Sequence, residues 1–337
     1  MDYKTLLENA RKRLAPHCRV CKHCDGVSCA GEMPGLGGTG SGSSFQNNVK
    51  ALAKLKLNLR TLHEASEPDL SFSFCGMPLV APVMVAPLAA LGFQTGNKLT
   101  DEQWTDAVVA AARQIGTIAW TGDGPEPSFF AAGINAMRKN NYAAVPVIKP
   151  RANEAILERI KQAEQAGALA VGIDVDAAGI INMKLKGQPV GPKTKADLMY
   201  ITENTSLPVF VKGIMTPDEA LIAAEAGAAG IVVSNHGGRV LDHTPGTAEV
   251  LAEIAAEVRG RILVIADGGI RSGEDILKML ALGADAVLVG RPLLFGVAGG
   301  DAEGAAFMLT KLINELRTAM ILTGCASLSA ISPAVLR

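Results

Sequence analysis

Residues 208–239 read PVFVKGIMTPDEALIAAEAGAAGIVVSNHGGR and contain the unit from which most of the chain is built. The two ends of this stretch, 208–214 and 229–234, are short and almost wholly apolar, as is typical of parallel strands buried on both faces. Between them, Thr-Pro-Asp-Glu at 216–219 supplies a helix N-cap, a proline at the first helical position and two acids in the first turn. The stretch therefore predicts strand, helix and strand, followed by a polar loop rich in glycine.

The same alternation runs from residue 81 to the C-terminal part of the chain. We expect buried strands over 81–87, 115–120, 144–149, 170–175, 208–214, 229–234, 262–267 and 285–290. Amphipathic patterns predict helices over 102–114, 127–138, 153–166, 195–204, 216–226, 246–258, 273–282 and 302–318. Eight alternations within about 250 residues favour an α/β fold of the (β/α)8 TIM barrel type. An open, doubly wound parallel sheet is the alternative.

Residues 1–80 form an N-terminal extension ahead of the barrel, which we place at 81–337. The extension carries a cluster of cysteines. The run GLGGTGSGSS at 35–44 predicts a loop, because so many glycines and serines disfavour a helix. A helix over 45–57 and a pair of extended segments around 70–80 then lead into the first strand.

The composition argues against several classes of protein. Hydrophobic residues make up 48% of the chain and aromatic residues only 4%, so we expect a core of Ala, Val, Leu and Ile. With 32 basic and 33 acidic residues, the net charge of −1 favours neither nucleic acid nor an anionic membrane surface. The sequence has no apolar run of membrane-spanning length, and its first residues lack the apolar segment of a secretory signal. We therefore expect a cytoplasmic protein.

Polar and cationic side chains follow the last four predicted strands, at the rim where active sites of such barrels lie. Lys212 stands near the end of the fifth strand, and SNHGGR at 234–239 follows the sixth. The seventh strand leads into DGGIR at 267–271 and the eighth into GRP at 290–292. Four successive strands thus deliver candidate functional groups to one rim.

The loops after the seventh and eighth strands suit a phosphate group. Gly268 and Gly269 allow the backbone to approach closely, and the helix that follows offers free N–H groups at its start. Arg271 and Arg291 add positive charge. The alternative is that the glycines only form tight turns and the arginines are solvated. Two Gly-Arg pairs at corresponding strand ends make this alternative the weaker one.

His236 follows a predicted strand directly and lies among glycines, with Arg239 three residues further on. A histidine there can take a proton, and an arginine can pair with a substrate carboxylate. Lys212 leaves an apolar strand, so it stands either in a salt bridge with Asp174 or Asp267, or as a cation beside an electron-accepting cofactor.

Four segments resemble those of the FMN-dependent 2-hydroxy-acid oxidases and dehydrogenases: VKGI at 211–214, SNHGGRVLD at 234–242, DGGIRSG at 267–273 and GRP at 290–292. Glycolate oxidase, lactate oxidase and flavocytochrome b2 belong to that family. The resemblance extends back through 47–62 and 78–90 and covers about residues 33–320. It implies a TIM barrel that binds FMN, and it suggests a homotetramer.

The resemblance also implies roles for individual residues. His236 is similar to the base that removes the substrate proton, Arg239 to the carboxylate anchor, and Lys212 to the lysine that stabilises the negative charge of reduced flavin. We place Asp174 in the catalytic set as the partner of the histidine, although the spacing in GIDVD leaves Asp176 open. The other positions implied to bind FMN are Leu88, Ala89, Thr121, Ser234, Asp267, Gly268, Gly269, Arg271, Gly290 and Arg291.

The chain departs from the family in the residues that hold the substrate carboxylate. The family has a tyrosine ahead of the N-terminal helix, where this chain has MPG at 33–35. It has a second tyrosine and a glutamine at the end of the third strand, where this chain has VPVI at 145–148. The usual second arginine after the fourth strand is also missing, with Lys184 and Lys186 as candidate substitutes. Fold and cofactor survive these changes, but the substrate's identity does not follow from the resemblance.

Four of the six cysteines are crowded into one short segment, at Cys18, Cys21, Cys24 and Cys29. In a reducing compartment such crowding indicates metal binding rather than disulfides. The spacing C-x2-C-x2-C-x4-C lets three thiolates converge and a fourth close the shell, as in 4Fe–4S ligation, although Ala30 replaces the usual proline. Zinc is the alternative, with His17 or His23 able to replace a thiolate.

We predict that the protein oxidises an L-2-hydroxy acid to the 2-oxo acid. An iron–sulfur centre beside the flavin favours a dehydrogenase that passes electrons to an acceptor protein over an oxidase that makes peroxide. One alternative is a flavin barrel with another reaction, such as type 2 isopentenyl diphosphate isomerisation, and the pairing of His236 with Arg239 speaks against it. A second is a redox- or metal-sensing flavoprotein, to which the missing tyrosines lend weight.

Overall fold

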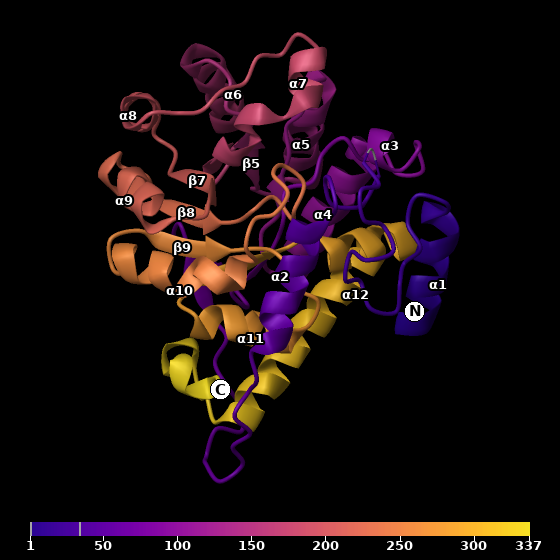
Figure 1. The fold of residues 1–337 in the computed structure, drawn as a ribbon, viewed down its shortest axis with the longest axis vertical. Helices are drawn as coiled ribbons and strands as arrows, with labels where there is room; N and C mark the ends of the chain where they lie inside the picture. The colour runs from indigo at the N-terminus through magenta and orange to yellow at the C-terminus, as the bar shows by residue number, and fades with distance from the viewer. Residues whose placement is uncertain (1, 34) are drawn as a thin grey trace.

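The computed structural model describes residues 2–33 and 35–337, and its centre is a barrel of eight parallel strands with helices around it (Figure 1). The strands are β3 (Val83–Val85), β4 (Trp120–Thr121), β5 (Val145–Ile148), β6 (Val171–Asp174), β7 (Val209–Ile214), β8 (Gly230–Val233), β9 (Leu263–Ala266) and β10 (Ala286–Val289). They pair in the order β3-β10-β9-β8-β7-β6-β5-β4. A parallel bridge between Val85 and Ala119 joins the two ends of this order. The predicted TIM barrel is therefore confirmed, and the open sheet is excluded.

All eight helices predicted for the barrel are present. They are α4 (Asp101–Ile115), α5 (Pro127–Asn140), α6 (Asn153–Gln165), α8 (Lys195–Glu203), α9 (Pro217–Glu225), α10 (Thr247–Val258), α11 (Gly273–Ala281) and α12 (Arg291–Thr323). Several begin at capping side chains: the Thr100 and Thr194 hydroxyls accept from backbone N–H groups of the first turns of α4 and α8, and the Ser272 hydroxyl does the same for α11. The last helix begins earlier than predicted, at Arg291, and bends at Gly300 and Asp301, where the backbone leaves the helical region.

Further elements lie outside the strand–helix repeat. They are α1 (Tyr3–Leu14), α2 (Ser43–Lys54), the hairpin strands β1 (Phe72–Phe74) and β2 (Met77–Leu79), α3 (Leu91–Gln94), α7 (Ile181–Leu185), and the 3-10 turns η1 (Val175–Gly179), η2 (Leu328–Ala330) and η3 (Pro333–Val335). Helix α1 packs against the long helix α12 (Figure 1). None of the helices in the described part of the chain combines the length and the hydrophobicity needed to cross a membrane.

The barrel interior is filled with apolar side chains at the N-terminal ends of the strands. Phe74 of the hairpin packs against Trp120 and Phe210, with ring centroids 6.1 and 5.2 Å apart. All three side chains are fully buried. Because this end is filled by aromatic packing, the polar groups of the barrel gather at the opposite, C-terminal rim.

Candidate active site

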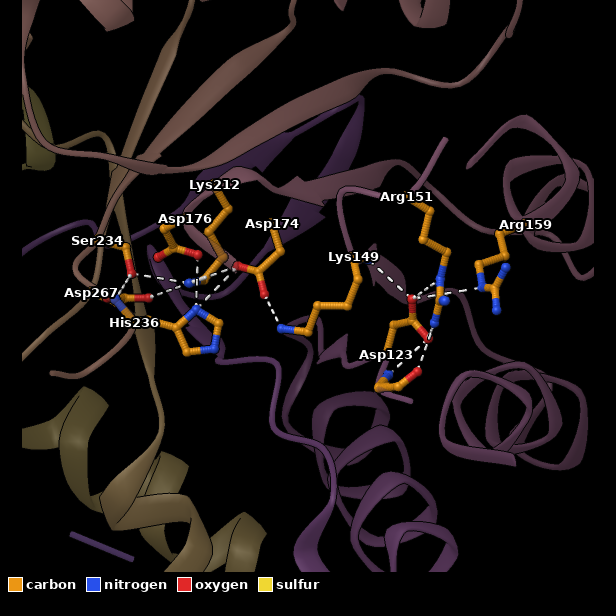
Figure 2. Close-up of polar contacts among 11 residues, drawn as sticks. Asp123, Lys149, Arg151, Arg159, Asp174, Asp176, Lys212, Ser234, His236 and Asp267 are labelled. Carbon is orange, nitrogen blue, oxygen red and sulfur yellow. Dashed lines mark hydrogen bonds and ion pairs between the residues drawn. The ribbon is translucent and has the colours of Figure 1, made fainter. Parts of the chain in front are cut away.

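His236 stands just after β8, and two carboxylates from the end of β6 face its ring (Figure 2). Nδ1 of His236 lies 2.9 Å from Asp176 Oδ1 and 3.5 Å from Asp174 Oδ1. Because carboxylates only accept hydrogen bonds, these contacts assign a proton to Nδ1 and leave Nε2 to take one from a substrate. The shorter contact is made by Asp176, the residue that the GIDVD spacing left open beside Asp174.

The charges around His236 set its protonation. Burial lowers the pKa of His236, but the carboxylates of Asp174 and Asp176 outweigh burial and raise it. Burial also raises the pKa of Asp176, which stays above its usual range. For Asp174 the effect of burial is overcome by His236, Lys149 and Lys212, which hold the pKa of that carboxyl well below its usual range. The site therefore combines a histidine whose pKa is raised with a carboxylate, Asp174, whose pKa is held low.

Lys212 lies at the centre of the rim, with a side chain that is only 4% exposed. Its Nζ is 3.5 Å from Asp174 Oδ1 and 3.6 Å from Asp267 Oδ2, and it donates to Ser234 Oγ at 3.0 Å. Burial lowers the pKa of Lys212, but Asp267, Asp174 and Asp176 outweigh burial and raise it. Lys212 therefore forms both of the salt bridges that the sequence suggests, with Asp174 and with Asp267, and its side chain also lines a cavity.

This cavity has a volume of about 170 Å³ and is lined by both apolar and polar residues, as small-molecule sites are. The residues implied to bind FMN that line it are Leu88, Ala89, Lys212, Asp267, Gly268, Gly269, Arg271, Gly290 and Arg291. Asp267 Oδ1 is buried there without a hydrogen-bond partner among the described residues. At Gly290 an added Cβ would meet nothing closer than 3.6 Å, so a ligand has room at this strand end. A cavity with cations, glycine loops and an unpaired acceptor fits FMN.

Two residues implied to bind FMN are absent from the lining of this cavity. Ser234 lies beside it, where its hydroxyl accepts from Lys212 and from the His236 N–H at 3.1 Å. Thr121 ends β4, and its side chain is buried against α5, where a Cβ on Gly133 would lie 2.4 Å from Thr121 Oγ1. Ser234 thus contacts residues of the cavity wall, whereas Thr121 faces a helix.

A second cavity adjoins the first, and both are lined by Ala89, His236 and Arg239. Arg239 donates from Nη1 to the carbonyl oxygen of Gly37 at 2.6 Å. Within the described residues it has no acidic partner at salt-bridge distance. Burial and the neighbouring charge of Arg291 lower the pKa of Arg239 to about 9. A buried guanidinium of this kind is stabilised by an anionic ligand.

Lys149 is a site residue that sequence reasoning missed. It follows β5, lines the second cavity, and places Nζ 2.5 Å from Asp174 Oδ2, with a side chain 11% exposed (Figure 2). The proposed substitutes for the missing arginine lie elsewhere, because Lys184 is exposed and Lys186 pairs with Glu126 at 3.1 Å on the surface. A lysine directly at the end of an apolar strand was the available signal.

A buried ion cluster supports the strand end that carries Lys149. Asp123, whose side chain is fully buried, lies 3.3 Å from Arg151 Nε and 3.6 Å from Arg159 Nε (Figure 2). Its Oδ2 also accepts the backbone N–H of Lys149 at 3.0 Å. The cluster therefore fixes the backbone from which Lys149 projects.

The four N-terminal cysteines come together around one small pocket. Cys18, Cys21, Cys24 and Cys29 all line it, together with Arg291. Within the described residues, no three of these sulfur atoms lie within 4.8 Å of one another. All four thiols are free and half-buried.

Comparison with known proteins identifies the family to which this chain belongs. The chain matches the family described as FMN-dependent dehydrogenase over residues 36–193 and 183–337. A peroxisomal (S)-2-hydroxyacid oxidase of Arabidopsis thaliana is 34% identical, over 88% of each chain, and an L-lactate oxidase of Lactobacillus jensenii is 33% identical, over 87% of this chain and 78% of its own. A crystal structure of mandelate oxidase superposes with a TM-score of 0.82 at 29% identity, covering 99% of this chain and 97% of that one. The chain is therefore a member of the FMN-dependent dehydrogenase family.

Proposed function

We propose that the protein oxidises an L-2-hydroxy acid to the corresponding 2-oxo acid. The observation that carries the proposal is that His236 and Arg239 line the wall between the two cavities. His236 is a base held by two carboxylates, and Arg239 is a buried cation without an acidic partner among the described residues. The first cavity suits the cofactor, because the glycine loops and Arg271 and Arg291 line it, and the second cavity, lined by Lys149, suits the substrate. Relatives named as oxidases of 2-hydroxy acids and lactate support this reaction class.

FMN in the first cavity would supply the acceptor for the two electrons that leave the substrate. The residues that hold it are the glycine loops after β9 and β10, with Arg271 and Arg291 at the phosphate end. Lys212 presents its charge to the same cavity and so favours extra negative charge there. Asp267 and Gly290 line the same cavity, and the open space at Gly290 leaves room there for the cofactor.

His236 takes the substrate proton at Nε2 in this proposal. Its partner Asp176, 2.9 Å from Nδ1, orients the ring and stabilises the imidazolium that results. Asp174 adds negative charge at 3.5 Å and links the histidine to both lysines of the site. Arg239 pairs with the substrate carboxylate.

We assign to Lys149 the place of the donors that the missing tyrosines would supply. Its Nζ uses one hydrogen-bond direction for Asp174 and has two left for a ligand in the second cavity. With Arg239 on the same cavity wall, two cations can hold the acid group of the substrate. The cavity therefore favours an anionic hydroxy acid over a neutral alcohol.

We further propose that the four cysteines bind a 4Fe–4S cluster, with zinc as the alternative. A tetrahedral zinc site needs sulfur atoms about 3.8 Å apart, given Zn–S bonds of about 2.3 Å. A cubane spreads its four thiolates more widely because each binds a different iron, and within the described residues no three of the cysteine sulfur atoms lie within 4.8 Å of one another. Such a centre favours a dehydrogenase with an acceptor protein over a peroxide-forming oxidase. A cytoplasmic homotetramer completes the proposal.

The test is an absorption spectrum of anaerobically purified protein before and after addition of a panel of 2-hydroxy acids, with iron and zinc assayed on the same sample. Flavin bands that bleach with one acid support the reaction and name the substrate class. Flavin that binds and never bleaches contradicts it. His236→Ala should lower turnover about 10²- to 10⁴-fold while FMN stays bound. Unchanged turnover in that variant would remove His236 as the base.

A further inference from the structure

We infer that the cysteine centre and the FMN phosphate site are coupled through Arg271 and Arg291, so that filling the centre tightens FMN binding. The inference rests on the proposed FMN site and cysteine centre, and it concerns their linkage rather than the reaction.

Arg271 belongs to both sites. Its Nε donates to the carbonyl oxygen of Cys24 at 3.1 Å, and its Nη2 lies 3.7 Å from Cys24 Sγ. A third bond runs from Nη1 to the Ile270 carbonyl at 2.9 Å. The same side chain lines the FMN cavity. The guanidinium is therefore oriented by the cysteine loop while it faces the cofactor.

Arg291 forms a wall between the two sites, because it lines both the FMN cavity and the cysteine pocket. Leu36 lines both as well. The two arginines also share an aromatic support: the Arg291 guanidinium lies 5.0 Å and the Arg271 guanidinium 5.7 Å from the centroid of the Phe45 ring. Only a side chain's thickness thus separates the two sites.

The backbone of the cysteine loop packs directly on that ring. Gly26 lies between the third and fourth cysteines, and a Cβ there would come within 2.1 Å of Phe45 Cδ1. Gly26 has a φ of +82°, which glycine adopts without strain. Phe45 itself lines the FMN cavity. The loop thus contacts the cofactor site through Phe45 and through Arg271.

The direction of the coupling follows from what holds the loop. Residues 18–33 form turns and bends without a helix or strand, so bonds to a shared centre would fix the loop. With the loop fixed, Arg271 keeps its acceptor at Cys24 and is already oriented when the phosphate arrives. The thiolates repel the phosphate, but the positive charges of Arg291, which lines both sites, and of Arg271, which contacts Cys24 and lines the FMN cavity, offset that repulsion. We therefore expect the fixed orientation of Arg271 to outweigh the repulsion between the thiolates and the phosphate.

The experiment measures the FMN dissociation constant of the flavin-free protein by quenching of flavin fluorescence. We compare protein with the centre filled and protein from which iron has been removed anaerobically with a chelator. The affinity should fall at least tenfold without the centre and in Cys24→Ser. Cys75→Ser, which changes a cysteine outside the cluster, should bind FMN as the wild type does. Riboflavin, which lacks the phosphate, should bind equally well with and without the centre.

The outcomes separate this inference from the proposed function. Protein that binds no iron or zinc overturns the centre and the coupling, while hydroxy-acid turnover still reports on the reaction. A filled centre with FMN affinity that changes less than twofold on its removal overturns the coupling alone. Riboflavin affinity that falls as far as FMN affinity removes the phosphate and the arginines as the link. In Arg271→Lys the difference between filled and empty centre should shrink.

Reciprocity provides a measurement that needs no variant. If the centre raises FMN affinity by some factor, FMN raises the affinity of the metal by the same factor. The chelator concentration that removes half the iron from wild-type protein should therefore rise at least tenfold when FMN is bound. An unchanged concentration overturns the coupling even where Cys24→Ser fails to fold.

Discussion

The two halves of the barrel rim are built in different ways. The half that follows β7 to β10 presents glycine loops and arginines to the cavity proposed for FMN. The half that follows β4 to β6 is held by buried ion pairs, which run from Arg159 through Asp123 to the backbone of Lys149 and from its side chain to Asp174 (Figure 2). The first half offers glycine loops and arginines to a ligand, whereas the second half lines its cavity with side chains that are held in buried ion pairs.

The difference reflects what each half has to hold. A phosphate is bound by backbone N–H groups and a few cations. Contiguous residues such as DGGIRSG at 267–273 can supply both. A substrate carboxylate needs isolated cations at fixed positions, and a buried cation is stable only with partners from other strands. Changes in the substrate half should therefore alter stability and substrate binding while leaving the cofactor half intact.

Asp123→Ala should produce the largest effect. It leaves Arg151 and Arg159 without their buried carboxylate, which costs about 3 to 5 kcal/mol of the free energy of unfolding. Denaturant unfolding of the flavin-free protein measures this loss. Asp106→Ala is the control, because its pair with Lys139 is exposed and worth less than about 1 kcal/mol. Equal losses in the two variants would contradict a supporting role for the buried cluster.

Lys149→Met should weaken substrate binding and leave FMN binding unchanged. Loss of one charged hydrogen bond, worth about 1.5 to 3 kcal/mol, raises KM about 10- to 100-fold. Steady-state kinetics with the acid that bleaches the flavin, together with an FMN titration, provide the measurement. Lys184→Met changes an exposed lysine and should behave as the wild type does. A KM that does not move in Lys149→Met would leave this lysine with a purely structural part.

The sequence also predicts the two halves of the rim to different extents. The apolar runs locate each of the eight strands, although β4 (Trp120–Thr121) overlaps its predicted range, 115–120, only at Trp120. His236, Arg239 and the glycine loops are candidates from the sequence because strand ends and contiguous motifs are local signals, and the structure places them around one cavity. The pair of Lys149 and Asp174 joins residues 25 positions apart on neighbouring strands. Only the barrel's register brings them together, so no local pattern could indicate it.

Asp174→Asn should shift the pH dependence of turnover. His236 must be neutral to accept a proton, so kcat/KM rises with pH through its pKa, which Asp174 and Asp176 raise. Removing one of the two negative charges lowers that pKa, while Lys149 and Lys212 remain and act in the same direction. The acid limb of the profile should therefore move to lower pH by about one unit. A limb that moves to higher pH, or not at all, would contradict control of His236 by this carboxylate.

Thr121→Val should have the smallest effect, and it tests where the boundary between the two halves runs. The resemblance to the family implies that Thr121 binds FMN, but its hydroxyl packs against α5 beside Gly133, and Thr121 is not among the residues that line the cavity proposed for FMN. Valine has nearly the same shape, so the packing survives and only the hydroxyl is lost. We expect the FMN dissociation constant, measured by fluorescence quenching, to change less than about twofold, since no hydrogen bond to the cofactor is lost. A tenfold loss would mean that the β4 strand end turns toward the flavin when FMN binds, which would place it with the cofactor half of the rim.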